Sequence, residues 1–92
     1  MSRIVAKFGG SSLADTQHIM RVADIVIALR NKGHDLVVIV SAMLGQTDYL
    51  IQLAHEVADQ PCQREYDALL STGEQVSAAL LASCLIEKGY PA

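Results

Sequence analysis

The chain has 92 residues, of which 51% are hydrophobic and only 4% aromatic, and its formal net charge is −3 at pH 7. This hydrophobic content excludes a disordered chain, and the length allows one small domain or part of a larger one. The weak negative charge provides no basic stripe for nucleic acid, so we expect no nucleic-acid partner. No uncharged run is longer than Gln75 to Ile86, which is shorter than the roughly 20 residues of a membrane span, and no secretory signal is visible. We therefore expect a cytoplasmic protein with no membrane partner.

Residues 3–8 are predicted to form a strand that turns through two glycines toward a helix beginning near Asp15. The turn, Lys7-Phe8-Gly9-Gly10-Ser11-Ser12, has the features of a phosphate-binding loop. Glycines let backbone N–H groups approach an anion, and a helix N-terminus adds positive dipole character. Lys7 adds a mobile cation, and Ser11 and Ser12 add hydroxyl donors. The spacing fits neither a Walker A loop nor G-x-G-x-x-G, and a plain strand-to-helix turn is the alternative.

The helix predicted from about Asp15 to Lys32 ends at Gly33, a residue that tolerates a left-handed backbone. The following run, residues 36–40, is apolar and β-branched throughout, as in strands that are covered on both faces. Strand, helix and strand in this order form a right-handed βαβ unit. The sequence therefore predicts two parallel strands in an α/β sheet.

The segment from Ser41 to Asp48 leaves the carboxyl end of the second strand, the edge where parallel sheets bind their ligands. The glycine loop leaves from the same edge, so we expect Ser41 and Thr47 to face the same crevice as Lys7. Two alternatives stay open. Thr47 could cap the next helix, and Ser41 could be a turn hydroxyl that satisfies the local backbone.

Three further helices are predicted, at about residues 48–59, 63–70 and 71–88. Ser71 and Glu74 have the spacing of a capping box and Gly73 weakens a continuous helix, so a new helix is expected at Ser71. This last helix is apolar almost all round, which predicts burial on most sides. Two strands and about four helices leave these apolar elements short of partners, and a two-stranded sheet is too small to stand alone. We expect the chain to be the N-terminal piece of a larger domain.

No metal site is predicted. Cys62 and Cys84 lack the spacing of metal ligands and are typical of reduced thiols in a cytosolic protein. The three histidines likewise have no cysteine or carboxylate at ligand spacing.

Three segments together resemble the start of bacterial aspartokinases. They are Lys7-Phe8-Gly9-Gly10-Ser11-Ser12, Val40-Ser41-Ala42-Met43-Leu44-Gly45-Gln46-Thr47-Asp48 and Leu70-Ser71-Thr72-Gly73-Glu74-Gln75-Val76. Their order and spacing match across the whole chain, and together they separate aspartokinases from other amino acid kinases. The family usually has Thr where this chain has Ser11, which keeps the hydroxyl. The resemblance implies the N-terminal part of a three-layer α/β/α sandwich with a mainly parallel sheet, the amino acid kinase or carbamate kinase-like fold.

The resemblance also implies a reaction, in which ATP phosphorylates the β-carboxylate of L-aspartate on the way to lysine, threonine and methionine. It implies that Lys7 stabilises the phosphates as the catalytic cation, and that Phe8, Gly9, Gly10 and Ser11 complete the phosphate site. It further implies that Ser41 and Thr47 hydrogen-bond aspartate and that Glu74 pairs with its α-ammonium group; for Glu74 the capping box is the alternative. Mg²⁺ is expected to accompany ATP, held largely by phosphates and water, and the full-length protein is expected to be a homo-oligomer.

Several parts of an aspartokinase fall outside the resemblance. The family's later kinase segments supply an Arg and an Asp of the active site and the adenine pocket, and its C-terminal ACT domains are regulatory. We therefore expect the 92-residue chain alone to be inactive. Two other functions stay open. One is another amino acid kinase, such as one acting on acetylglutamate, although the segments around Thr47 and Glu74 fit aspartate better. The other is a non-catalytic module that binds a phosphate-bearing ligand or a partner chain.

Overall fold

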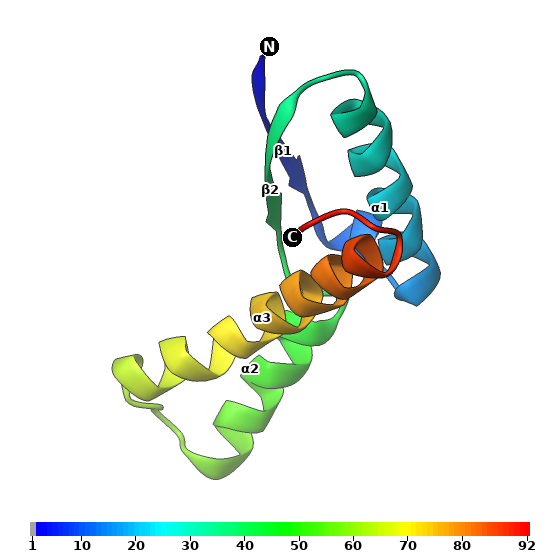
Figure 1. Ribbon diagram of the computed structural model, residues 1–92. Coiled ribbons are helices and arrows are strands. Elements are labelled where there is room, and N and C mark those ends of the chain that lie inside the picture. Colours follow the sequence, from blue (N-terminus) through cyan, green and yellow to red (C-terminus); the bar gives the residue numbers. More distant parts are fainter. Residues whose placement is uncertain (1) are drawn as a thin grey trace.

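The computed structural model describes residues 2–92 and measures 50 × 24 × 19 Å along its principal axes. Its elements are, in chain order, β1 (Arg3–Phe8), a short 3₁₀ helix η1 (Gly10–Leu13), α1 (Thr16–Asn31), β2 (Asp35–Val40), α2 (Gln46–Val57) and α3 (Gln63–Glu87). The two strands lie side by side next to α1, and α3 packs against both α1 and α2 (Figure 1). The α2–α3 hairpin extends away from the sheet, which makes the molecule elongated.

The strands pair in parallel, with Arg3 opposite Asp35 and Phe8 opposite Val40, which confirms the predicted βαβ unit. Parallel pairing requires a crossover between the strands, and α1 provides it. The helix begins and ends where the sequence predicts. The Asp15 carboxylate caps it by accepting the His18 N–H at 2.8 Å, and Gly33 after it has a positive φ of 92°.

The two faces of the sheet differ. Alternate residues of β1, such as Phe8, are half-buried against the helical layer, whereas Val5 on the other face is 62% exposed. In β2, Val37 and Ile39 are exposed in the same way. The prediction that β2 is covered on both faces is therefore wrong for residues 2–92, because no element of this part of the chain packs on the second face.

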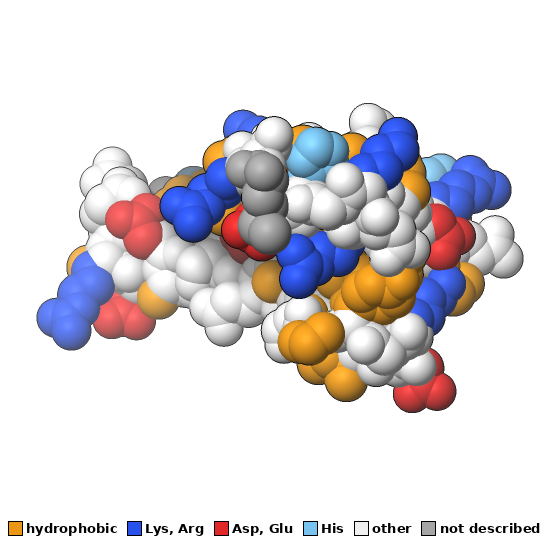
Figure 2. Space-filling model, turned by 45° about the horizontal axis from the view of Figure 1, so that its top comes forward, with side chains coloured by type: hydrophobic (Ala, Val, Ile, Leu, Met, Phe, Trp, Pro, Cys, Tyr) orange, Lys and Arg blue, Asp and Glu red, His pale blue; other side chains and the backbone are white. Residues whose placement is uncertain are grey.

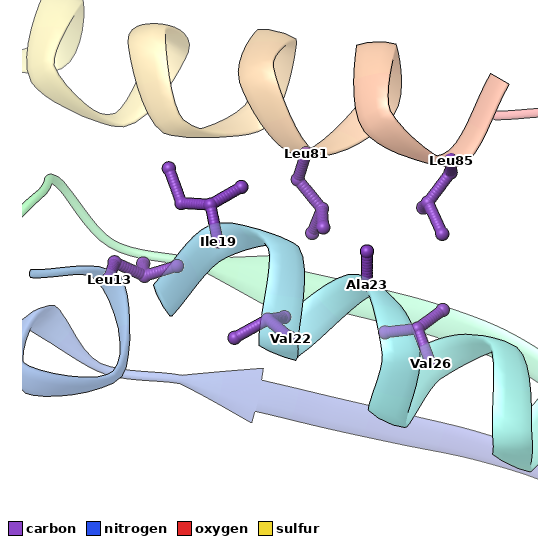
Figure 3. Packing of buried hydrophobic residues seen from close by; sticks show 7 residues of the cluster. All are labelled: Leu13, Ile19, Val22, Ala23, Val26, Leu81 and Leu85. Carbon is purple, nitrogen blue, oxygen red and sulfur yellow. The ribbon is translucent and has the colours of Figure 1, made fainter. Parts of the chain in front are cut away.

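The core lies between α1 and α3. Ile19 and Ala23 of α1 point toward α3, whereas Val22 lies on the side of α1 nearer the sheet, and a leucine from η1 closes one end of the cluster (Figure 3). The cluster consists of Leu13, Ile19, Val22, Ala23, Val26, Leu81 and Leu85. Aliphatic and alanine side chains fill this space, as the low aromatic content requires.

The start of α2 differs from the prediction. The helix begins at Gln46, and Gly45 occupies the N-cap position with a φ of 80°. This left-handed conformation suits glycine, which has no Cβ to clash. Thr47 therefore lies in the first turn of the helix, and its predicted alternative role as the N-cap is wrong.

The predicted break at Ser71 is also wrong, because α3 is one helix of 25 residues. The Ser71 hydroxyl donates to the Ala68 carbonyl at 2.8 Å, inside the helix, so it caps nothing. Gly73 is buried in the middle of this helix. Packing against α1 and α2 outweighs the weak local preference that glycine has against a helix.

The expected burial of α3 on most sides is contradicted as well. Val76, Leu80 and Ile86 are exposed, and hydrophobic side chains reach the surface between charged groups of both signs (Figure 2). By length and composition alone, α3 is apolar enough to cross a membrane, but core helices of soluble proteins pass the same test. The positions of α3 that are buried here face neighbouring helices, as in a core helix.

Candidate functional site

The three sequence segments singled out above meet at Ala42, which is 4% exposed in the segment after β2. A Cβ placed on Gly10 would lie 3.7 Å from the Ala42 carbonyl oxygen, and a Cβ placed on Gly73 would lie 2.9 Å from the Ala42 Cβ. The glycine loop, the segment after β2 and the middle of α3 are thus in contact. The three segments that carry the predicted site residues are therefore neighbours in the fold, although they are far apart in the sequence.

The glycine loop presents backbone amides. The Phe8 carbonyl accepts the Ser41 N–H at 3.2 Å, which joins this loop to the segment after β2. Ser12 N–H donates to the Gly9 carbonyl at 3.1 Å, whereas the amides of residues 9–11 have no backbone acceptor within residues 2–92. These three amides are the donors that a bound phosphate needs.

The loop does not run directly into α1, as the sequence predicts, because η1 lies between them. The Asp15 carboxylate caps the first turn of α1 by accepting the His18 N–H. His18 Nδ1 also lies 2.7 Å from Asp15 Oδ1, a partner that the sequence does not predict. These hydrogen bonds to His18 hold the pKa of Asp15 below its ordinary value of 3.8. The Asp15 carboxylate thus occupies the N-terminus of α1, and the loop amides are the donors left for an anion.

Lys7 is exposed near the end of β1, on the sheet face that α1 does not cover. Two ion pairs between permanently charged groups are present within residues 2–92, Arg30–Asp35 and Lys88–Asp24. Lys7 takes part in neither of them, nor in the contact between His18 and Asp15. The Lys7 ammonium group is therefore available to an anionic ligand beside the glycine loop.

Ser41, Thr47 and Glu74 belong to the segment after β2, to α2 and to α3. Ser41 is half-buried, and its hydroxyl makes only a long 3.4 Å contact with the Ala42 carbonyl. Thr47 is half-buried in the first turn of α2. Glu74 follows Gly73 in α3 and is exposed, and the ion pairs of the described chain do not include it. Because α3 is continuous, the capping-box alternative for Glu74 is wrong.

Together these groups suit two ligands, an anion and a polar molecule that carries an ammonium group. Loop amides and an ammonium group attract an anion, whereas hydroxyls and a carboxylate suit a polar molecule that carries an ammonium group. No group of three or more His, Cys, Asp or Glu side chains in residues 2–92 could hold a metal ion. A groove of about 580 Å³ between β2 and α3, lined mostly by apolar residues such as Val38 and Leu81, contains none of the predicted site residues.

Two residues of this region are missed by the sequence analysis, namely Ala42 and Gly73. Each is small, and each is buried at the contact between the segments. A signal for Gly73 does exist, because an isolated glycine inside a helical pattern usually has a packing reason. Nothing local distinguishes Ala42 from the other alanines of the chain.

Comparison with known proteins agrees with this arrangement. The sequence is 54% identical to the aspartokinase of Geobacillus stearothermophilus, and 51% identical to Aspartokinase 2 of Bacillus subtilis and to the aspartate kinase Ask_LysC of Stutzerimonas stutzeri. Each match covers 100% of this chain but only 22% or 23% of the relative. The fold superposes on the crystal structure of aspartate kinase from Synechocystis with a TM-score of 0.94 at 47% identity, over 100% of this chain and 16% of that one.

The family assignment rests on the whole of the described structure. The sequence pattern of the amino acid kinase family matches residues 2–92, which include both strands, all three α-helices and every predicted site residue. The chain therefore belongs to the amino acid kinase family.

Proposed function

We propose that residues 2–92 are the amino-terminal part of an aspartate kinase. The full-length protein transfers the γ-phosphoryl group of ATP to the β-carboxylate of L-aspartate, the first step toward lysine, threonine and methionine. The observation that carries this proposal is the meeting of three segments at Ala42. One segment is a loop suited to binding phosphate, and the other two carry groups suited to binding an amino acid. The similarity to several aspartokinases over the full chain supports it.

On the ATP side, the amides of Gly9, Gly10 and Ser11 hold phosphate oxygens, and Phe8 places the loop at the end of β1. Lys7 adds a cation beside them. Phosphoryl transfer needs mainly alignment of the reactants and neutralisation of the charge on the transferred group. Lys7 is the catalytic residue of this segment because its charge faces the place where negative charge develops. Mg²⁺ enters with ATP and neutralises phosphate charge while bound mostly to phosphates and water.

On the aspartate side, Ser41 and Thr47 donate hydrogen bonds to the substrate, and Glu74 pairs with its α-ammonium group. Contact of the segments that carry them with the glycine loop at Ala42 supports a role in which they hold the carboxylate to be phosphorylated near the γ-phosphoryl group. Holding two reactants in this way accounts for much of the acceleration in such reactions. We also propose that the protein is cytoplasmic and that the full-length form is a homo-oligomer.

The test is an assay of the full-length protein with MgATP and a panel of acceptors, in which the acyl phosphate is trapped by hydroxylamine. We expect hydroxamate formation with L-aspartate and none with N-acetyl-L-glutamate. Turnover with N-acetyl-L-glutamate alone would support a different amino acid kinase. Phosphate or nucleotide binding without turnover on either acceptor would support a non-catalytic module.

A further inference from the structure

The presence of Gly73 in the middle of α3 is not explained by helix propensity. A glycine in the middle of a helix costs about 1 kcal/mol relative to alanine, yet α3 continues through it without a break. The structure gives the reason, since the residue is buried where α3 meets the segment after β2. A larger side chain does not fit at this position.

We propose that the contact between Gly73 and Ala42 is a positioning contact that sets the spacing between Glu74 and the hydroxyls of Ser41 and Thr47. It thereby determines the affinity for aspartate. This inference rests on the proposed function, and it adds a residue that touches no substrate. Glu74 follows Gly73 directly, and Ser41 precedes Ala42 directly, so a shift at this contact changes the distance between the groups that hold one small molecule.

The distances show how tight the contact is. A Cβ on Gly73 would lie 2.9 Å from the Ala42 Cβ, a separation that real Cβ atoms do not adopt. The Ala42 Cβ has no side-chain torsion through which it could move away, so the backbone must shift. The next neighbours, Leu50 Cδ1 at 3.4 Å and Gln46 Cγ at 3.7 Å, are ordinary contacts with side-chain ends. The strain therefore falls on one pair of atoms.

The glycine loop has more room. A Cβ on Gly10 would meet the Ala42 carbonyl oxygen at 3.7 Å and Leu44 Cα at 3.8 Å, both ordinary van der Waals separations. A shift of a few tenths of an ångström at Gly73 is therefore expected to change the aspartate contacts more than the phosphate contacts.

The experiment compares four variants of the full-length protein: Gly73→Ala, Ala42→Gly, the double variant with both changes, and Thr72→Ala as a control. Thr72 is the exposed neighbour of Gly73, and its hydroxyl binds only the Leu69 carbonyl, at 2.7 Å. We measure KM for aspartate, KM for ATP, kcat and the thermal unfolding midpoint of each variant. The Ala42→Gly change removes the atom that lies 2.9 Å away, so the double variant has only ordinary contacts at this position.

We expect Gly73→Ala to raise KM for aspartate about tenfold, because misplacement by a fraction of an ångström weakens a positioned site strongly. KM for ATP should change by less than about threefold, since the phosphate loop keeps its contacts. Thr72→Ala should leave both values unchanged. In the double variant, KM for aspartate should return close to the value for Ala42→Gly alone, which a general loss of stability would not produce.

An unchanged KM for aspartate in Gly73→Ala overturns the inference, as does a double variant that is no better than Gly73→Ala. If Gly73→Ala does not fold, recovery of folding in the double variant supports the contact and failure to recover overturns it. If the wild-type protein does not act on aspartate, the proposed function fails separately. The unfolding midpoints of the wild type, the two single variants at positions 73 and 42 and the double variant then show whether the two positions are coupled. If the shifts in midpoint of the two single variants simply add up in the double variant, the contact itself is refuted.

Discussion

Replacing Lys7 by alanine should abolish most of the turnover of the full-length protein while leaving its fold intact. Lys7 is exposed and takes part in none of the ion pairs within residues 2–92, so its loss should change the free energy of unfolding by less than about 0.5 kcal/mol. The loss of transition-state stabilisation is larger than this change in the free energy of unfolding. Removing one donor aimed at developing charge lowers kcat by about 10²- to 10³-fold, or roughly 2.7–4 kcal/mol. The kinetic effect therefore exceeds the folding effect severalfold, and the two can be separated.

The assay is hydroxamate formation with saturating aspartate and MgATP, run beside urea denaturation of the same preparation. Arg3→Ala is the matched control, because Arg3 lies on the same exposed face of β1 at its opposite end. Lys7→Arg keeps the charge but changes its geometry, and should retain more activity than Lys7→Ala. A kcat for Lys7→Ala within about threefold of wild type, with normal unfolding, would refute the role assigned to this cation.

Four other predictions follow from the same structure. Glu74→Gln should raise KM for aspartate about tenfold or more with a smaller change in kcat, since it removes a charge-assisted contact to a non-reacting end of the substrate; an unchanged KM would contradict this. Leu81→Ala should lower the free energy of unfolding by about 2–5 kcal/mol in urea denaturation, because Leu81 is only 4% exposed in the α1–α3 core; a loss below about 1 kcal/mol, half the lower end of that range, would show that the site can collapse. Asp15→Asn should lower the thermal midpoint at neutral pH but not in acid. The pKa of Asp15 is lowered from 3.8, so its stabilisation is present above that pH and is lost as the pH falls through the folded-state value; a constant difference across the acid range would contradict the cap. The isolated 92-residue chain should self-associate through its exposed apolar faces and show no aspartate-dependent turnover, which light scattering and the hydroxamate assay can check, and a monodisperse monomer or measurable turnover would oppose this.

The elements nearest the start of the chain could be predicted from the sequence because their signals are local. A β-branched run, an Asp at the start of a helix and a Gly after its end specify β2 and α1 through backbone preferences and hydrogen bonds between neighbours. The candidate residues of the two loops were predicted from their types and from the rule that loops after parallel strands end at one edge of the sheet, whereas the role of Glu74 was implied by the resemblance and stays a prediction.

Long-range contacts decided what the sequence alone did not. An isolated glycine and a capping-box spacing predict a helix break at Ser71, but α3 is continuous because it packs against α1 and α2, with Gly73 buried at the contact with Ala42. The left-handed Gly45, and not Thr47, is the N-cap of α2. The sequence pattern of β2 describes a strand covered on both faces, whereas residues 2–92 cover only one. The continuity of α3 and the coverage of β2 depend on residues that are distant in the sequence. The N-cap of α2 depends on a backbone conformation that side-chain type alone does not specify. Only the folded chain therefore determines these three features.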